Sequence, residues 1–343
     1  AAGDQAGLEA FLAGPNAASL AGAGDRLFEG GHFEAARAVF ARIPNWGRLA
    51  ATHLKLGRWQ DAVDAARKAA VPKVWKAVCY GCLAAGETKL AQLAGLAVVV
   101  NADDLDEVVS HYLAAGLGDE LIALLESGIG LDRAHMGIFT ELGIQYARAR
   151  PAKLMEHLKL FGSRLNVPRL IRVCEEAHLW KELVFLYIAY DEPDNAARVM
   201  MAHAPVAWEH VLFKDVAVKV ADAGVYYAAV SFYLEAHPDL LVDLLKVLEA
   251  RVDHARVVGV LRSAGHLALA KDYLLAVQKA DIPAVNDAVN ELLVEAGDAE
   301  GLAESVRTYT NFDALALAGA LKAHPSPSFR RVAAGIFRAQ AKW

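Results

Sequence analysis

The sequence predicts an all-α fold, an α-α superhelix in which helical hairpins stack as a right-handed α-solenoid. Three observations support this prediction: a hairpin phrase returns about every 30 residues, apolar residues follow a period of about 3.6 residues, and glycines and prolines stand between the apolar stretches. No stretch alternates polar and apolar residues between hairpin turns, so strands are not expected. A repeat of this length indicates units that pack on their sequence neighbours and act through extended surfaces.

The recurring phrase is a glycine near the start of a helix, followed within a few residues by an aromatic or aliphatic residue and an alanine. It is clearest in residues 31–35, 57–62 and 86–91. Looser copies begin at Gly116, Ala177, Gly224, Gly265 and Gly297. No linker or low-complexity segment separates the copies, so we expect one uninterrupted series of hairpins.

The helices are predicted from the residues between those turns. In residues 106–114 and 120–126 the apolar side chains fall on one helical face, and a third strip continues through Ile138, Phe139 and Leu142. Because proline is tolerated in the first turn of a helix and not in its interior, prolines mark the ends of helices of roughly 10–14 residues. These prolines are Pro15, Pro44, Pro72, Pro151, Pro168, Pro193, Pro205, Pro238, Pro283 and Pro325.

Composition argues against several classes of protein. The chain has 35 basic and 41 acidic residues without a block of like charge, which disfavours a nucleic-acid partner. No apolar run reaches the ~18 residues that a membrane span requires. The first residues lack the basic and apolar regions of a secretory signal, and they begin inside an expected helix, as in a piece of a longer array. Three cysteines without paired spacing across the chain favour a reducing, cytoplasmic setting.

Motifs that carry chemistry are weak. Cys79 and Cys82 have the CxxC spacing of a redox pair or half a zinc site, but they lie in a helical pattern without a second pair, which favours two buried structural thiols. His178 and Glu182 stand four residues apart, whereas zinc needs three or four convergent ligands. The common nucleophile, phosphate-binding and dinucleotide-binding motifs are absent. We therefore expect no catalytic residue, metal or cofactor, and a protein that is not an enzyme.

Long phrases of the sequence resemble the clathrin heavy-chain family, in its leg-repeat region. They are too long for generic similarity among helical repeats, and together they cover essentially the whole chain. The phrases are residues 14–16, 24–26, 47–50, 133–142, 156–161, 177–187, 194–196, 213–215, 251–256, 311–313 and 329–334.

The resemblance implies a segment of the proximal leg of the triskelion. Residues 1–92 would be the C-terminal part of one clathrin repeat, 95–242 a complete repeat, and 245–343 the N-terminal part of a further repeat. The implied function is structural: the lattice coat of vesicles in endocytosis and intracellular protein transport, on the cytoplasmic face of coated pits and coated vesicles. Periodicity alone also fits a generic peptide-binding α-solenoid of tetratricopeptide type, but the uneven spacing and the missing Trp-x-x-Leu-Gly signature disfavour it.

The resemblance also implies partners. These are the clathrin light chain and other heavy-chain legs of the trimeric triskelion and its cage lattice, with no nucleic acid and with membrane contact only through adaptors. Family positions that contact the light chain align with Arg148, His237 and Gly162. Arg148 keeps the charge of a lysine in a different geometry. His237 replaces a lysine by a weaker base, and Gly162 replaces a tryptophan anchor.

Clathrin assembly is favoured by mild acidity, and leg histidines are candidates for that response in the family. His157 and His254 match two such positions. Two others of the set are Ala97 and Asn101 in this chain. The sequence therefore predicts a weakened response of assembly to pH.

Overall fold

The structure, a computed structural model, describes residue 7 and residues 19–340 of the chain. Within this part every regular element is a helix and no strand is present, which confirms the all-α prediction. Pro15 and the phrase 14–16 lie outside the described residues. The chain divides into two compact units, Ala1–Glu182 and Leu183–Trp343, and helix α13 (Trp180–Ala189) contains the division.

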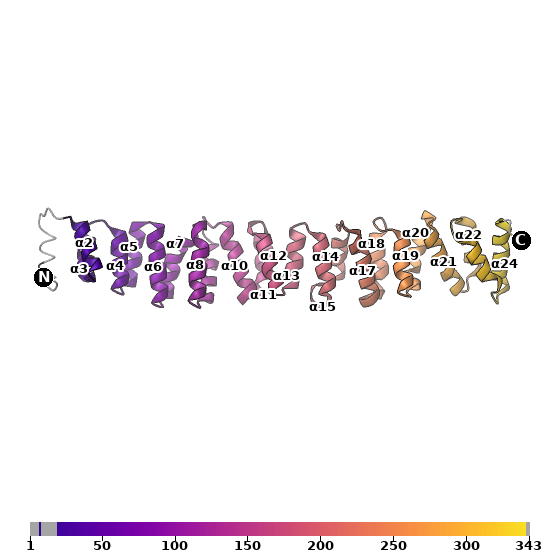
Figure 1. Cartoon of the computed structure of the whole chain (residues 1–343), viewed down its shortest axis with the longest axis horizontal. Coiled ribbons are helices and arrows are strands. Elements are labelled where there is room, and N and C mark those ends of the chain that lie inside the picture. Colours follow the sequence, from indigo (N-terminus) through magenta and orange to yellow (C-terminus); the bar gives the residue numbers. More distant parts are fainter. Residues whose placement is uncertain (1–6, 8–18, 341–343) are drawn as a thin grey trace. The chain divides into compact units, whose positions relative to one another are not determined.

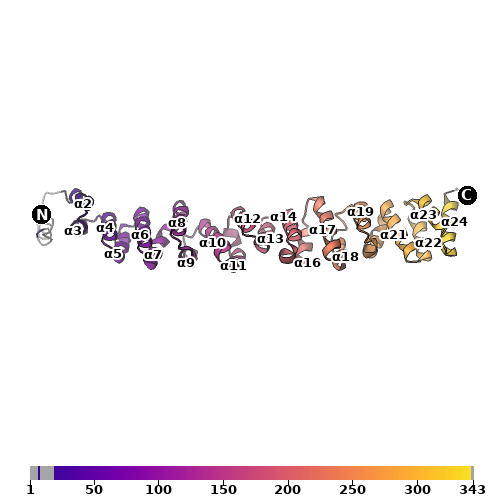
Figure 2. The same ribbon diagram turned by 60° about the horizontal axis from the view of Figure 1, so that its bottom comes forward.

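Unit 1 is an array of helices in which each packs on the next one or two along the chain (Figures 1 and 2). For example, α10 packs on α9, α11 and α12. The helices are α2 (Leu20–Glu29), α3 (Phe33–Arg42), α4 (Trp46–Lys55), α5 (Trp59–Ala69), α6 (Pro72–Ala84), α7 (Thr88–Val99), α8 (Ala102–Ala114), α9 (Gly118–Gly128), α10 (Met136–Ala149), α11 (Pro151–Phe161), the 3-10 turn η1 (Gly162–Arg164) and α12 (Val167–Glu176).

Unit 2 has the same kind of neighbour packing, as between α19 and α21 and between α22 and α24. Its elements after α13 are α14 (Pro193–Ala202), α15 (Ala204–Ala207), α16 (His210–Ala217), α17 (Ala223–Ala236), η2 (Pro238–Leu240), α18 (Leu241–Leu248), α19 (His254–Ser263), η3 (Leu267–Ala270), α20 (Lys271–Val277), η4 (Gln278–Ala280), α21 (Pro283–Glu295), α22 (Ala299–Thr308), α23 (Ala314–Lys322) and α24 (Pro327–Ala339).

Eight of the described turns that end a helix share one backbone geometry. In each, a residue with positive φ follows the helix, and the next N–H donates to the carbonyl five residues earlier, as Arg58 does to the His53 oxygen at 2.9 Å. This arrangement is the Schellman motif, which satisfies carbonyls at the helix end and favours glycine. The positive-φ residues are Gly31, Gly57, Gly86, Gly116, His178, Asp191, Gly265 and Gly297.

The glycine phrases of the sequence therefore mark real turns at six positions. Gly224 differs: it lies in the first turn of α17, after the N-cap Asp222, whose carboxylate accepts its N–H at 2.8 Å. At the phrase beginning at Ala177, the turn residue is His178 with φ of 55°. The imidazole thus occupies a backbone conformation that glycine adopts at less cost.

All of the predicted proline boundaries within the described residues are confirmed, but some helices are shorter than expected. α15 has 4 residues and α20 has 7. Only His203 separates α15 from α14, and Pro205 lies in the first turn of α15. Only His237 separates η2 from α17, and η2 begins at Pro238. Because proline can open a helix but not continue one, closely placed prolines divide this part into shorter pieces.

Apolar faces supply the core of each unit. The strip predicted around Ile138, Phe139 and Leu142 is fully buried in α10. Polar contacts also join neighbouring layers, such as Arg58 to Glu34 at 2.8 Å and Arg150 to Asp119 at 2.6 Å. Exposed ion pairs of this kind contribute only about 0.2–1 kcal/mol each, so burial of the apolar faces dominates stability.

Candidate interaction surfaces

The thiols of Cys79 and Cys82 are buried in α6 and form no disulfide. Burial raises the pKa of Cys79 to about 12 and that of Cys82 to about 11, which keeps both sulfurs protonated at neutral pH. Both thiols are therefore buried, as the sequence analysis predicts. Across residues 19–340, no three His, Cys, Asp or Glu side chains are grouped so as to hold a metal ion. Nor does this part contain a helix with the length and apolar character that crossing a membrane requires.

Arg148 and Gly162 both lie on the surface of unit 1. Arg148 is exposed in the last turn of α10, where a cation also interacts favourably with the negative end of the helix dipole. Gly162 opens η1 directly after α11, and a Cβ added there would meet no atom within 4 Å. A large side chain at this position therefore has open space on the unit.

His157 is buried between α10 and α11, with 4% of its surface exposed. Its Nε2 donates to the Phe139 carbonyl oxygen at 2.8 Å, and its ring meets Tyr146 edge-on at a centroid distance of 5.5 Å. Loss of hydration lowers the pKa of His157, and the hydrogen bond to Phe139 opposes that shift in part. Protonation of His157 would therefore act through the packing of these two helices and not through a surface contact.

His237 ends α17 in unit 2, and its ring stacks on Trp208 at 3.8 Å with 6° between the planes. Beside this stack, His210 bridges two helices, with Nδ1 2.9 Å from the Tyr233 hydroxyl and Nε2 2.9 Å from Asp243. Since a carboxylate only accepts, Nε2 donates to it. Hydrogen bonds from Lys214 and then His210 lower the pKa of Asp243. Sequence reasoning missed this cluster because it joins side chains from two separate stretches, residues 208–214 and residues 233–243.

His254 is the first residue of α19 and is half-buried. Its Nδ1 lies 2.7 Å from the hydroxyl oxygen of Tyr273 in α20, and the two rings meet edge-on. Two residues further along, the Arg256 guanidinium lies 3.9 Å from the centre of the Tyr227 ring. His254 thus links α19 to α20 inside unit 2.

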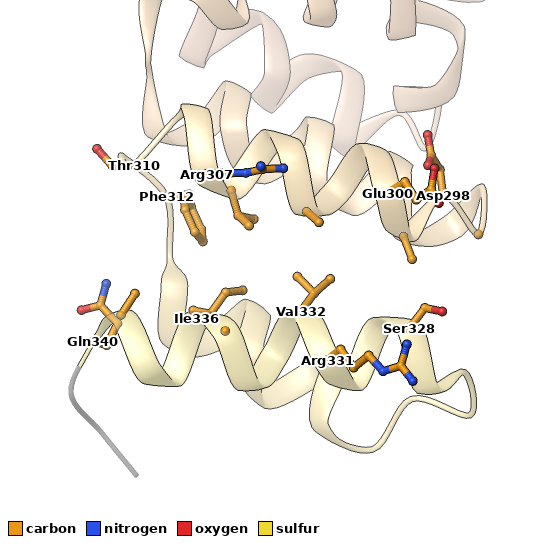
Figure 3. A pocket seen from close by; sticks show the side chains of 16 residues that line it. Asp298, Glu300, Arg307, Thr310, Phe312, Ser328, Arg331, Val332, Ile336 and Gln340 are labelled. Atoms are coloured by element: carbon orange, nitrogen blue, oxygen red, sulfur yellow. The ribbon is translucent and has the colours of Figure 1, made fainter.

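A groove of about 960 Å³ lies between α22 and α24. Figure 3 shows Val332 and Ile336 of α24 facing Phe312 and the side of α22, with Asp298, Glu300, Arg331 and Ser328 at one end. Small residues line both helices at this level: Ala299, Ala303, Gly335 and Ala339. Small side chains leave space that larger ones would fill, which explains the groove between two packed helices.

A second hollow, which we name the acidic groove, lies between α19, α21 and α23 and has a volume of about 440 Å³. Apolar side chains of α21 and α23 line it together with four carboxylates, one arginine and one histidine. The apolar residues are Val294, Ala316, Leu317, Ala320 and Leu321, and the charged or titratable ones are Asp287, Glu291, Glu295, Asp313, Arg262 and His324. Residues 281–313 hold eight Asp or Glu and one Arg, a bias that the sequence analysis passed over.

Positive charge gathers in unit 1 where α11 leads through η1 into α12. We call this the basic edge, and it comprises Lys159, Leu160, Arg164, Arg169 and Arg172, all exposed. Leu160, with 67% of its surface exposed, is the most exposed of the large apolar side chains described. Residues 159–172 hold these four cations and no acidic residue. An exposed apolar side chain in such a segment is typical of a contact surface for an acidic, partly apolar partner.

Comparison with known proteins identifies the family. The family pattern described as "Region in Clathrin and VPS" matches residues 2–90, 96–241 and 245–343. The chain is 54% identical to clathrin heavy chain 1 of Oryza sativa subsp. japonica, 52% to clathrin heavy chain 1 of Arabidopsis thaliana and 46% to clathrin heavy chain 2 of Homo sapiens. Each match covers 98% of this chain and 20% of the relative, so the chain spans about a fifth of their length. With helical hairpins throughout both units and this similarity along almost its whole length, the chain belongs to the clathrin heavy-chain family.

Proposed function

We propose that this chain is a leg segment of the clathrin triskelion and acts as a structural part of vesicle coats. The observation that carries the proposal is the family match, which runs through almost the whole of an array of stacked hairpins. Residues 1–92, 95–242 and 245–343 serve as the end of one clathrin repeat, a complete repeat and the start of another. The segment works in endocytosis and intracellular transport on the cytoplasmic face of coated pits and vesicles, without catalysis.

Within the coat, the segment binds two kinds of partner: other heavy-chain legs and the clathrin light chain. Light-chain binding follows helix-in-groove recognition, with apolar anchors and acidic light-chain residues that meet basic leg residues. The exposed guanidinium of Arg148 supports this. His237 is stacked on Trp208, and Gly162 offers no side chain, so both contribute less than the family residues they replace.

Binding of purified clathrin light chain tests the proposal directly. We expect saturable binding at one light chain per leg segment in isothermal titration calorimetry. Arg148→Glu should weaken it, whereas Gly162→Trp should strengthen it because a ring at that position has open space. Arg67→Glu on α5 is the matched surface control. A folded segment that binds no light chain, or that instead binds short peptides at a single site, contradicts the proposal and supports the tetratricopeptide-like alternative.

We further propose that His157 and His254 contribute to assembly at mild acidity, with a weaker response than in relatives that also carry histidines where this chain has Ala97 and Asn101. His157 would act from the interior, because its protonation places a poorly hydrated charge between α10 and α11. The test compares cage yield of the full-length heavy chain at mildly acidic and at neutral pH, with and without Ala97→His and Asn101→His. An acid response that these substitutions leave unchanged argues against this reasoning.

A further inference from the structure

The acidic groove has an unbalanced charge. Arg262 pairs with Glu291 at 2.7 Å, so this cation is already engaged. Asp287 accepts the N–H of Asp313 at 2.9 Å, and both of these carboxylates keep further oxygen lone pairs free. Glu295 is exposed and forms no ion pair with another described residue. The groove therefore offers negative charge on its rim above a floor of leucine, valine and alanine side chains.

A partner for such a groove should present an apolar side chain flanked by cations. Among the described residues, three large apolar side chains are more than half exposed in helices of at least eight residues: Leu160, Val211 and Met136. Val211 lies between Glu209 and Asp215 in sequence, so acidic residues flank it as they flank the groove. Leu160 follows Lys159 directly and belongs to the basic edge.

The cations of the basic edge differ in whether they already interact within the chain. Arg164 donates to the Ala134 carbonyl at 2.7 Å, and Arg169 lies 3.6 Å from Glu141. Lys159 and Arg172 are exposed and form no ion pair with another described residue. The basic edge therefore offers the exposed Leu160 and two cations unpaired among the described residues, Lys159 next to it in α11 and Arg172 in α12, which complement an acidic rim above an apolar floor.

We propose that the acidic groove of one chain receives the basic edge of a second copy. Leu160 of that copy enters between α21 and α23, while the cations of the basic edge face the acidic rim, on which Glu295 is unpaired among the described residues and Glu291 is shared with Arg262. The inference rests on the proposed packing of legs against one another and assigns residues to one such contact. Because the two surfaces differ, the contact is heterologous and leaves a free groove and a free edge on the pair.

The strength of this contact should be low and salt-dependent. Solvent-exposed ion pairs contribute about 0.2–1 kcal/mol each, and salt screens them over about 8–10 Å. A single contact of this type is reversible, and many of them act together in a lattice. Self-association is therefore expected at high protein concentration and low ionic strength, and it should decrease as salt is added.

Charge reversal with compensation tests the proposal. One variant reverses the groove (Glu291→Lys with Glu295→Lys), and the other reverses the edge (Lys159→Glu with Arg172→Glu). In sedimentation-velocity experiments each variant alone should associate about tenfold more weakly than the unaltered chain, and a one-to-one mixture of the two should regain association. Glu304→Lys, an acid of α22 outside the groove, is the control and should behave as the unaltered chain does.

Glu295→Lys alone serves as a milder groove variant, because it leaves the Arg262–Glu291 pair intact. Circular dichroism establishes that each variant is folded. An unaltered chain that stays monomeric under all conditions, or variants that do not regain association when mixed, overturns the proposal. So does a basic amphipathic peptide that occupies the groove while copies of the chain do not associate. Light-chain binding by the same samples is a separate measurement, so the proposed function can fail or stand independently.

Discussion

Replacing Gly116 by alanine tests how the turns hold the array together. Gly116 has φ of 73° in the turn from α8 to α9, and a Cβ added there meets no atom within 4 Å. Steric contact therefore adds nothing, and the effect is purely conformational. The left-handed conformation costs an L residue about 1–2 kcal/mol, whereas the less flexible unfolded chain returns about 0.4–1 kcal/mol. We expect Gly116→Ala to reduce the free energy of unfolding by about 1 kcal/mol.

The control is Gly118→Ala, two residues away. Gly118 is the first residue of α9, has an ordinary φ and also has open space where a Cβ would lie, so alanine there should be neutral or slightly stabilising. Because stacked arrays need not unfold in one transition, the assay is native-state hydrogen exchange of the α8 and α9 amides together with urea denaturation. About a fivefold loss of protection is expected for Gly116→Ala. Equal protection in the two variants would refute the reasoning.

Three further outcomes follow from the described geometry. Ala70 ends α5 with φ of 52°, a conformation that glycine adopts at less cost. Ala70→Gly should therefore raise the free energy of unfolding by up to about 1 kcal/mol, measured by urea denaturation. A decrease would show that Ala70 is not strained. Because burial lowers the pKa of His157, folded chain binds this proton less readily than unfolded chain, so stability should fall as pH drops below about 6.5, by at most about 1.4 kcal/mol per pH unit. His157→Gln should remove the contribution of His157 to the slope of stability against pH. The contribution of His53, whose pKa burial also lowers, should remain. Leu124→Ala should lower the free energy of unfolding by about 2–5 kcal/mol, because it leaves a cavity in unit 1. A decrease of less than about 1 kcal/mol in urea denaturation would contradict this and show that the neighbouring side chains fill the cavity.

The fold was predictable because its determinants are local. A glycine with positive φ, a proline in the first turn and an apolar face each act within a few residues, so Gly57, Pro151 and the strip around Phe139 could be interpreted one at a time. The short helices of unit 2 were less predictable. Helix propensity and hydrophobic periodicity do not reveal that α15, which contains Pro205, is a separate helix of only one turn after α14.

The surfaces were less predictable, because they depend on which side chains meet across layers. His157 was expected to contribute a contact in assembly, and its burial against Phe139 depends on how α10 and α11 turn toward one another. The acidic groove required α19, α21 and α23 to be placed together. Charge bias along residues 281–313 could have indicated its sign but not its shape.

The polar contacts between neighbouring helices have a consequence for folding during protein synthesis. Hydrogen bonds between helices join residues that are near in sequence, such as His157 to the Phe139 carbonyl, 18 positions apart, and His135 to the Val99 carbonyl, 36 positions apart. A nascent chain can therefore close each layer soon after the next helix leaves the ribosome, without waiting for residues far along the chain. At any moment during translation, the uncovered apolar surface is then confined to the growing edge. Protection by chaperones is needed there and not along the finished layers behind it.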